Sequence, residues 1–102
     1  SHGQAVAMGM LGAGKMSLEL GLWSHADLTQ LTDLITSFGF PTHISNTGIT
    51  AETLYSKMLM DKKLSQGVLN FVLPDKIGHV NIVPINDVDL ILNSISHILD
   101  TH

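Results

Sequence analysis

The spacing of hydrophobic residues along the chain predicts four helices and one β-hairpin. In three segments apolar residues recur every three or four positions, which is the period of an amphipathic helix, and a fourth segment at the start is apolar on nearly every side. Two runs rich in β-branched residues flank the sequence PDKIG, which is typical of a hairpin closed by a proline and glycine turn. The pattern therefore predicts a mainly α fold of about four helices plus one small β-hairpin.

The first predicted helix runs from about Gln4 to Leu20, and Lys15 and Glu19 are its only charged residues. Such a helix is expected to be buried around most of its circumference, which one small domain could hardly achieve. Glycines within and beside it each cost roughly 1 kcal/mol relative to alanine in a helix interior. We therefore expect a neighbouring backbone or a ligand to come close to them; they stand at positions 3, 9, 12 and 14.

The second predicted helix begins at Ser24, which forms a near capping box with Asp27. Its apolar stripe covers residues 28–38, Gly39 ends it and Pro41 prevents it from resuming.

The rest of the chain predicts a loop over residues 42–49 and a third helix capped by Thr50 and ending at Asp61. After the hairpin, Asn86 or Asp87 is expected to cap the fourth helix.

Composition supports one domain over residues 1–102, with 44% hydrophobic and 14% charged residues. The net charge is -4, and only Lys62 and Lys63 place two cations side by side, so nucleic acid is not an expected partner. The longest apolar run is broken by charges and lacks the basic flank of a signal peptide, which argues against a membrane segment. The absence of cysteine excludes disulfides and thiolate chemistry and agrees with a cytoplasmic location.

His2 is one candidate for chemistry. A neutral imidazole suits zinc, but a site needs three or four ligands and the local sequence supplies no others. The remaining histidines show no helical i, i+4 pair and are expected to be structural or surface residues; they are His25, His43, His79, His97 and His102.

The sequence MDKK is the second candidate. Lys62 and Lys63 could complement the negative end of a helix dipole, or one of them could contact an anionic phosphate group. Composition alone does not choose between these alternatives. No paired-carboxylate set, serine nucleophile elbow or P-loop is present, and the G-x-x-G-x-G of GMLGAGK lies in a helical pattern with no preceding strand, which excludes a dinucleotide-binding fingerprint.

The opening SHGQAVAMGM resembles the H-G-E-A-V-A-x-G-M signature of 3-dehydroquinate synthase, the shikimate-pathway member of the sugar phosphate cyclases. The similarity continues in order through LGLWS, FGFPT, MLMDKK and GVLNFVLPDKIG, and so covers essentially the whole chain. The resemblance implies the helical C-terminal domain of the dehydroquinate synthase-like fold. It also implies a two-domain enzyme whose N-terminal nucleotide-binding domain is absent from these residues.

The same resemblance implies roles for two residues. His2 matches one of three protein ligands of a catalytic zinc, the other two being upstream, and Lys62 matches the lysine that contacts the substrate phosphate. No role transfers to Lys63. Gln4 stands where the family usually has glutamate, and Asn70 where a basic residue is common.

The activity implied is a lyase reaction of aromatic amino acid biosynthesis: 3-deoxy-D-arabino-heptulosonate 7-phosphate gives 3-dehydroquinate and phosphate, with NAD and zinc, or cobalt in its place. The intact enzyme is expected to be a cytoplasmic homodimer, and the 102 residues alone are expected to be inactive. Two alternatives are a related cyclase acting on another sugar phosphate, and a free-standing helical module whose apolar first helix binds a partner.

Overall fold

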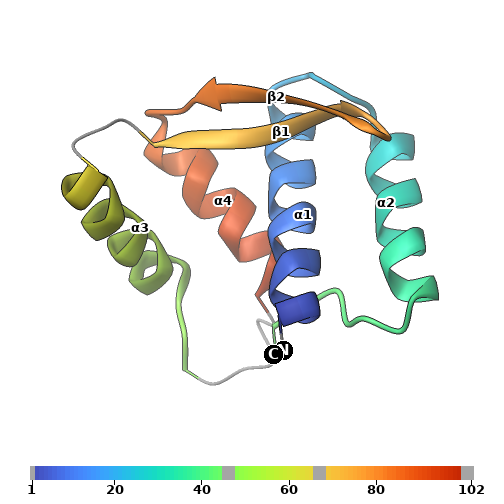
Figure 1. The fold of residues 1–102 in the computed structure, drawn as a ribbon, viewed down its shortest axis with the longest axis horizontal. Helices are drawn as coiled ribbons and strands as arrows, with labels where there is room; N and C mark the ends of the chain where they lie inside the picture. Colours follow the sequence, from blue (N-terminus) through green and yellow to red (C-terminus); the bar gives the residue numbers. More distant parts are fainter. Residues whose placement is uncertain (1, 45–47, 66–68, 100–102) are drawn as a thin grey trace.

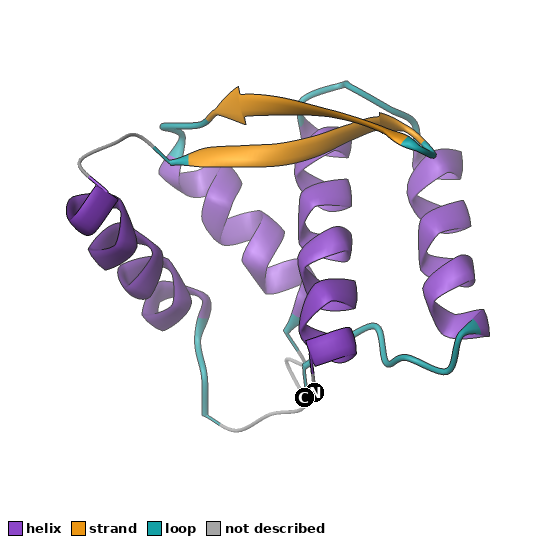
Figure 2. Ribbon diagram, in the orientation of Figure 1, coloured by secondary structure: helices purple, strands orange, loops and turns teal. Residues whose placement is uncertain are grey.

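The computed structural model describes residues 2–44, 48–65 and 69–99 and confirms a mainly α fold. Within these residues four helices accompany one two-stranded antiparallel sheet, as Figures 1 and 2 show. The elements in chain order are α1 (His2–Glu19), α2 (His25–Ser37), α3 (Ala51–Ser65), β1 (Asn70–Lys76), β2 (His79–Pro84) and α4 (Val88–Ile98).

Helix α1 is the central element of the fold. It stands between α2 and α4 with the hairpin lying across one end, while α3 stands apart on the far side of α4 (Figure 1). Two hydrophobic clusters meet on α1, because its side chains contribute to both. The cluster toward α2 comprises Ala7, Met8, Leu11, Trp23, Leu28, Leu31 and Ile35, and the cluster toward the sheet and α4 comprises Met16, Leu73, Ile85 and Ile91.

Gly14 of α1 is tightly packed against Trp23 and α2. A Cβ at this position would lie 2.9 Å from Leu28 Cδ1, 3.0 Å from Trp23 Cζ2 and 3.2 Å from Leu31 Cδ2. The indole Nε1 of Trp23 donates a buried 2.9 Å hydrogen bond to the Gly14 carbonyl oxygen. Close approach does occur at Gly14, but side chains make it rather than the backbone or ligand that the sequence led us to expect.

The start of α2 confirms the capping box. The Ser24 hydroxyl accepts a hydrogen bond from the Asp27 backbone nitrogen at 3.2 Å, and the Asp27 carboxylate accepts one from the Ser24 backbone nitrogen at 3.0 Å. Gly39, with φ +82°, follows the end of the helix in the left-handed region that favours glycine.

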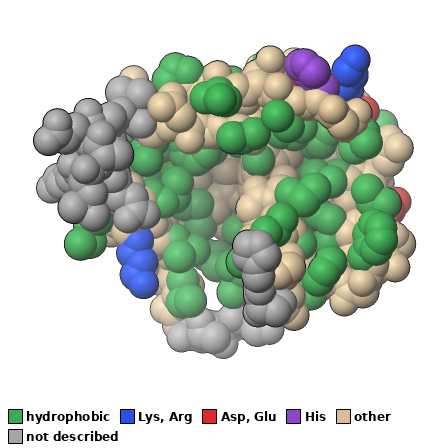
Figure 3. Space-filling model, viewed as in Figure 1, with side chains coloured by type: hydrophobic (Ala, Val, Ile, Leu, Met, Phe, Trp, Pro, Cys, Tyr) green, Lys and Arg blue, Asp and Glu red, His purple; other side chains and the backbone are tan. Residues whose placement is uncertain are grey.

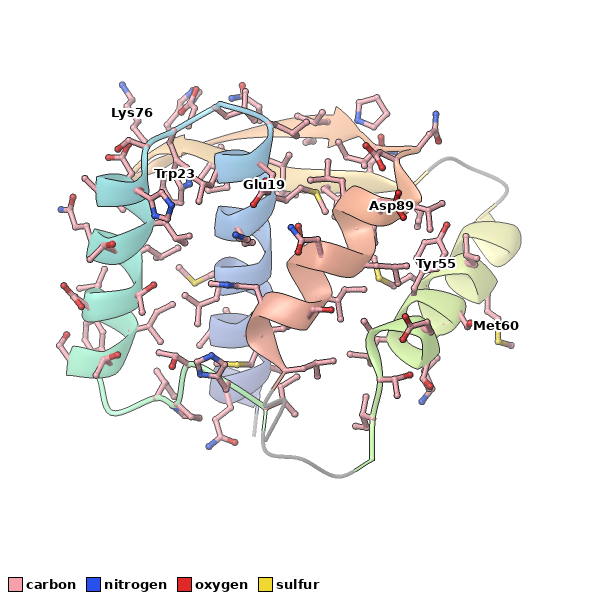
Figure 4. All side chains as sticks on the ribbon, turned by 180° about the vertical axis from the view of Figure 1, so that it is seen from behind. Glu19, Trp23, Tyr55, Met60, Lys76 and Asp89 are labelled. Atoms are coloured by element: carbon pink, nitrogen blue, oxygen red, sulfur yellow. The ribbon has the colours of Figure 1, made fainter. Side chains whose placement is uncertain are left out.

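Helix α3 is longer than expected. Thr50 caps it as predicted, accepting a hydrogen bond from the Thr53 backbone nitrogen at 3.1 Å, but the predicted end at Asp61 is wrong because the helix continues to Ser65. No glycine or proline occurs between 61 and 65, so nothing local stops it. Tyr55 points toward α4 and Met60 points away from the body of the molecule (Figure 4).

The hairpin is confirmed, but its turn is shorter than the predicted PDKIG. Pairing extends to Lys76 and His79, so the turn is Ile77 and Gly78, the glycine having φ +87°. The register shifts between Pro74 and Lys76. Asp75, at this bulge, accepts hydrogen bonds from His79 Nδ1 at 2.7 Å and from the Asn81 amide at 3.0 Å, and these bonds lower the pKa of its carboxyl group.

The fourth helix begins as expected. The Asp87 carboxylate accepts a 3.1 Å hydrogen bond from the Leu90 backbone nitrogen, so Asp87 rather than Asn86 is the cap.

Alanine substitutions at two glycines of α1 should separate helix propensity from packing. A Cβ added at Gly9 would have no atom within 4 Å, so Gly9→Ala should raise the free energy of unfolding by up to about 1 kcal/mol. Gly14→Ala should be less stable than Gly9→Ala by roughly 1–3 kcal/mol, since its Cβ overpacks the contact with Trp23 and Leu28. Urea unfolding of both variants measures this, and equal stability would refute tight packing at Gly14.

Candidate functional site

Two apolar grooves lie on either side of Gly9 and Ala13 of α1, on the face shown in Figure 3. The first, which we call the α1–α4 groove, has a volume of 410 Å³. Its lining comes from α1, α3, β1 and α4: Met8, Gly9, Gly12, Ala13, Met16, Met58, Asn70, Phe71, Val72, Ile91, Ser94, Ile95 and Ile98. None of these residues is ionisable, so the walls of this groove carry no formal charge.

The two residues expected in the site lie on helices that both contribute to this groove, but neither residue is among those that line it. His2 is the first residue of α1, and Lys62 lies in α3 one turn after Met58, which lines the groove. The side chains of His2 and Lys62 lie outside the described part of the structure, so their contacts are not part of it. The backbone brings their helices to one groove and leaves the roles of both residues as predictions.

The first turn of α1 packs against the segment that follows α2. A Cβ at Gly3 would lie 3.1 Å from the ring of Phe40, so glycine lets this ring come close beside His2. The blocks SHGQAVAMGM and FGFPT, far apart in the sequence, are thus neighbours in space. At position 3, as at position 14, a side chain makes the close contact.

The two departures from the family pattern lie at the edges of the site. Gln4 is exposed, and α1 carries no acidic residue in its first turn. Asn70 begins β1, pairs with Pro84 and lines the α1–α4 groove. Both residues are neutral, so neither adds charge next to His2 or to the groove.

The described residues do not form a metal site by themselves. Among them, no three histidine, aspartate or glutamate side chains come together in a way that could hold an ion. A zinc ion at His2 would need further ligands from outside the described residues.

A histidine cluster elsewhere was missed by the sequence reasoning. A 240 Å³ pocket brings together three of the histidines that had been expected to stand singly, His25, His43 and His97, along with Asp33. They come from two helices and the loop after α2, so no sequence spacing signals them. Burial lowers the pKa of His97 below its ordinary value of 6.5, and the charges of Lys15 and His43 lower it further.

Comparison with known proteins gives a consistent result. The family model described as 3-dehydroquinate synthase C-terminal matches residues 1–64. The chain is 39% identical over 82 residues to the 3-dehydroquinate synthase of Nostoc punctiforme, covering 80% of this chain and 22% of the relative. It is 34% identical over 100 residues to that of Synechococcus sp., covering 95% and 27%. It is 43% identical over 89 residues to the 3-dehydroquinate synthase of Xylella fastidiosa, covering 87% of this chain and 23% of the relative.

The fold is a mainly helical domain with one β-hairpin. The chain belongs to the 3-dehydroquinate synthase family, and its match is to the C-terminal region of that family. It spans about a quarter of the length of the relatives named above. No helix in the described ranges is long and apolar enough to cross a membrane.

Protonation of His97 should oppose folding. Because its pKa is lowered in the folded chain, the unfolded chain binds a proton there first as the pH falls through about 6.5, and the free energy of unfolding decreases. His97→Gln should therefore lose less stability than the parent between pH 7.5 and pH 5.5, as measured by urea unfolding. An equal loss in both proteins would contradict a burial effect at His97.

Proposed function

We propose that these residues supply the C-terminal part of a 3-dehydroquinate synthase, which converts 3-deoxy-D-arabino-heptulosonate 7-phosphate to 3-dehydroquinate and phosphate. The observation that carries this proposal is family membership over residues 1–64, which include both family motifs. The H-G motif opens α1 and the D-K-K motif lies in α3, and other residues of these two helices help to line the α1–α4 groove. The expected cytoplasmic homodimer, in which a nucleotide-binding domain precedes residues 1–102, is part of the same proposal.

His2 supplies one imidazole ligand to a zinc ion, and the remaining ligands come from the preceding polypeptide. Bound zinc, or cobalt, would act as a Lewis acid and as a template for substrate oxygens. Helix α1 suits a ligand position because both hydrophobic clusters hold it, which fixes where its first turn stands. Gln4, two residues after His2, can hydrogen-bond near the ligand without adding a negative charge.

Lys62 binds the phosphate group of the substrate. An ammonium group on a flexible stem can reach an anion as a point charge. Among the described residues that line the α1–α4 groove, which include Met58 one turn before Lys62, no carboxylate would compete for the lysine.

NAD binds to the part of the enzyme outside this chain. The only glycine-rich run that resembles a nucleotide motif, residues 9–14, lies within α1 rather than in a strand-to-helix loop. In our proposal this chain therefore positions metal and phosphate, and the preceding domain holds the nucleotide.

A chimera tests the proposal. These 102 residues would replace the aligned segment of the Nostoc punctiforme synthase, and NAD-dependent phosphate release and dehydroquinate formation would be measured. Turnover by the chimera, with none from the isolated chain, is the expected result. A folded, zinc-containing chimera that turns over only a different sugar phosphate would indicate the related cyclase instead.

His2→Ala in this chimera should remove one metal ligand. We expect less than one zinc ion per chain and a decrease in kcat of more than about 100-fold. Residues that only orient a metal ligand already change metal affinity or activity by roughly 10–100-fold when mutated, so loss of the ligand itself should have a larger effect. His25→Ala, at an exposed position of α2, is the matched control and should retain both metal and activity. Full zinc occupancy in the His2 variant, by metal analysis, would rule out the ligand role.

Lys62→Ala should weaken phosphate binding without affecting the metal. Loss of a charge-assisted hydrogen bond, worth roughly 1.5–3 kcal/mol, predicts a decrease of about 10- to 100-fold in kcat/KM. Lys57→Ala, an exposed lysine of the same helix, serves as the control. If steady-state kinetics gave the two variants the same kcat/KM, Lys62 would not be the phosphate contact.

A further inference from the structure

The second groove, which we call the α1–α2 groove, is larger than the first and is not used by the proposed chemistry. It has a volume of 490 Å³ and lies between α1, α2 and the hairpin. Its lining comprises Val6, Gly9, Met10, Ala13, Trp23, Leu31, Leu34, Val72, Pro74, Lys76, Ile77, Gly78, His79 and Val80. All but two of these side chains are non-ionisable, and nearly all are apolar.

Apolar side chains in this groove remain in contact with water. Val6 is 47% exposed, Met10 44%, Leu34 44% and Val80 55%. Figure 3 shows hydrophobic side chains gathered on this face, below the hairpin. A contiguous apolar surface of this kind marks an interaction site, whereas single exposed apolar residues do not. Helix α1 is therefore covered on two sides and open on a third.

The length of the relatives indicates what covers this face. The chain spans 22% of the Nostoc punctiforme synthase, and its family match is to the C-terminal region, so most of that polypeptide precedes the match. The groove follows α1 from Val6 to Ala13, beginning one turn after His2. At a rise of about 1.5 Å per residue, the distance along α1 from Val6 to Ala13 is about 10 Å. This is the approximate diameter of an α-helix, so one helix crossing α1 would fill the groove.

We propose that the α1–α2 groove seats an apolar helix from the part of the synthase that precedes these residues. This inference rests on the proposed function. The occupying helix packs on Gly9, where nothing lies within 4 Å of a Cβ position and the backbone can be approached closely. The occupying helix presents apolar side chains to the groove, because most residues that line the groove are apolar.

The charges of the groove add one feature to this partner. Lys76 and His79, both beside the hairpin turn, are its only ionisable lining residues within the described ranges. Figure 4 shows Lys76 at this end of the molecule, above the start of α2. His79 is bonded to Asp75, whereas no salt bridge is seen for Lys76 in the described part. An acidic side chain or the negative end of the occupying helix therefore lies near the turn.

Thiol protection tests the proposal, because the chain contains no cysteine. Met10→Cys and Val88→Cys place single thiols at positions of nearly equal exposure, 44% in the groove and 43% at the start of α4. Each variant would be labelled with a maleimide both as the isolated chain and within the Nostoc punctiforme chimera, and labelling at that position would be quantified by peptide mass spectrometry. Circular dichroism would verify that both variants keep the helical content of the parent.

We expect the thiol at position 10 to react with maleimide in the isolated chain. In the chimera its reaction should be at least about tenfold slower, which corresponds to a free energy of about 1.4 kcal/mol for exposing the buried thiol. The thiol at position 88 should react at the same rate in both. Equal reaction at position 10 in both proteins would overturn the proposal. Protection already present in the isolated chain would also overturn it, and would indicate a second copy of the chain in the groove.

The enzymatic activity of the chimera separates this inference from the proposed function. An active chimera with a reactive thiol at position 10 would refute the groove proposal alone. Protection at position 10 in a chimera without synthase activity would support the groove proposal and refute the function.

Discussion

The packing of Trp23, Leu28 and Leu31 against Gly14 fixes how α2 lies on α1, because a side chain at position 14 would displace all three. The indole donates to the Gly14 carbonyl oxygen, and its ring occupies the space that a Cβ would need. Leu28 and Leu31 then close over the same spot from α2. One residue without a side chain thus lets a large aromatic ring be both buried and hydrogen-bonded.

With α2 fixed on one side and the sheet and α4 on the other, α1 serves two hydrophobic clusters at once. Neither cluster reaches the strip around Gly9, so a third side of the helix faces the two grooves. The same packing that makes α1 rigid therefore leaves a surface open. In a metal enzyme this combination is useful, because a ligand at the start of a rigid helix keeps its position while other polypeptide segments assemble around it.

Local chemistry made part of this structure predictable from the sequence. The Ser24 and Asp27 box, the Thr50 cap and the hairpin depend on neighbouring residues, and the structure confirms all three. The predicted hairpin turn was too long because strand pairing continues through Lys76. The predicted end of α3 was too early because no helix-breaking residue follows Asp61 within the helix. The His43 and His97 pocket could not be predicted, since only tertiary packing joins these residues.

The roles predicted for His2 and Lys62 come from motif resemblance rather than from spacing, and they remain predictions because the described part of the structure does not include their side chains. When the ligands of a zinc site come from distant segments, one segment can hold a single ligand. The spacing of residues within that segment then does not reveal the site.

A backbone hydrogen bond links the loop after α2 to the end of α4. The Ile44 nitrogen donates to the Ile98 carbonyl oxygen at 2.7 Å, in an isolated bridge that also pairs Ile44 with Leu99. Exchange of the Ile44 amide hydrogen with solvent requires this bond to break, so protection at Ile44 would report on the attachment of the end of α4. The same loop carries Phe40 against Gly3, so one connecting segment contacts both the start of α1 and the end of α4.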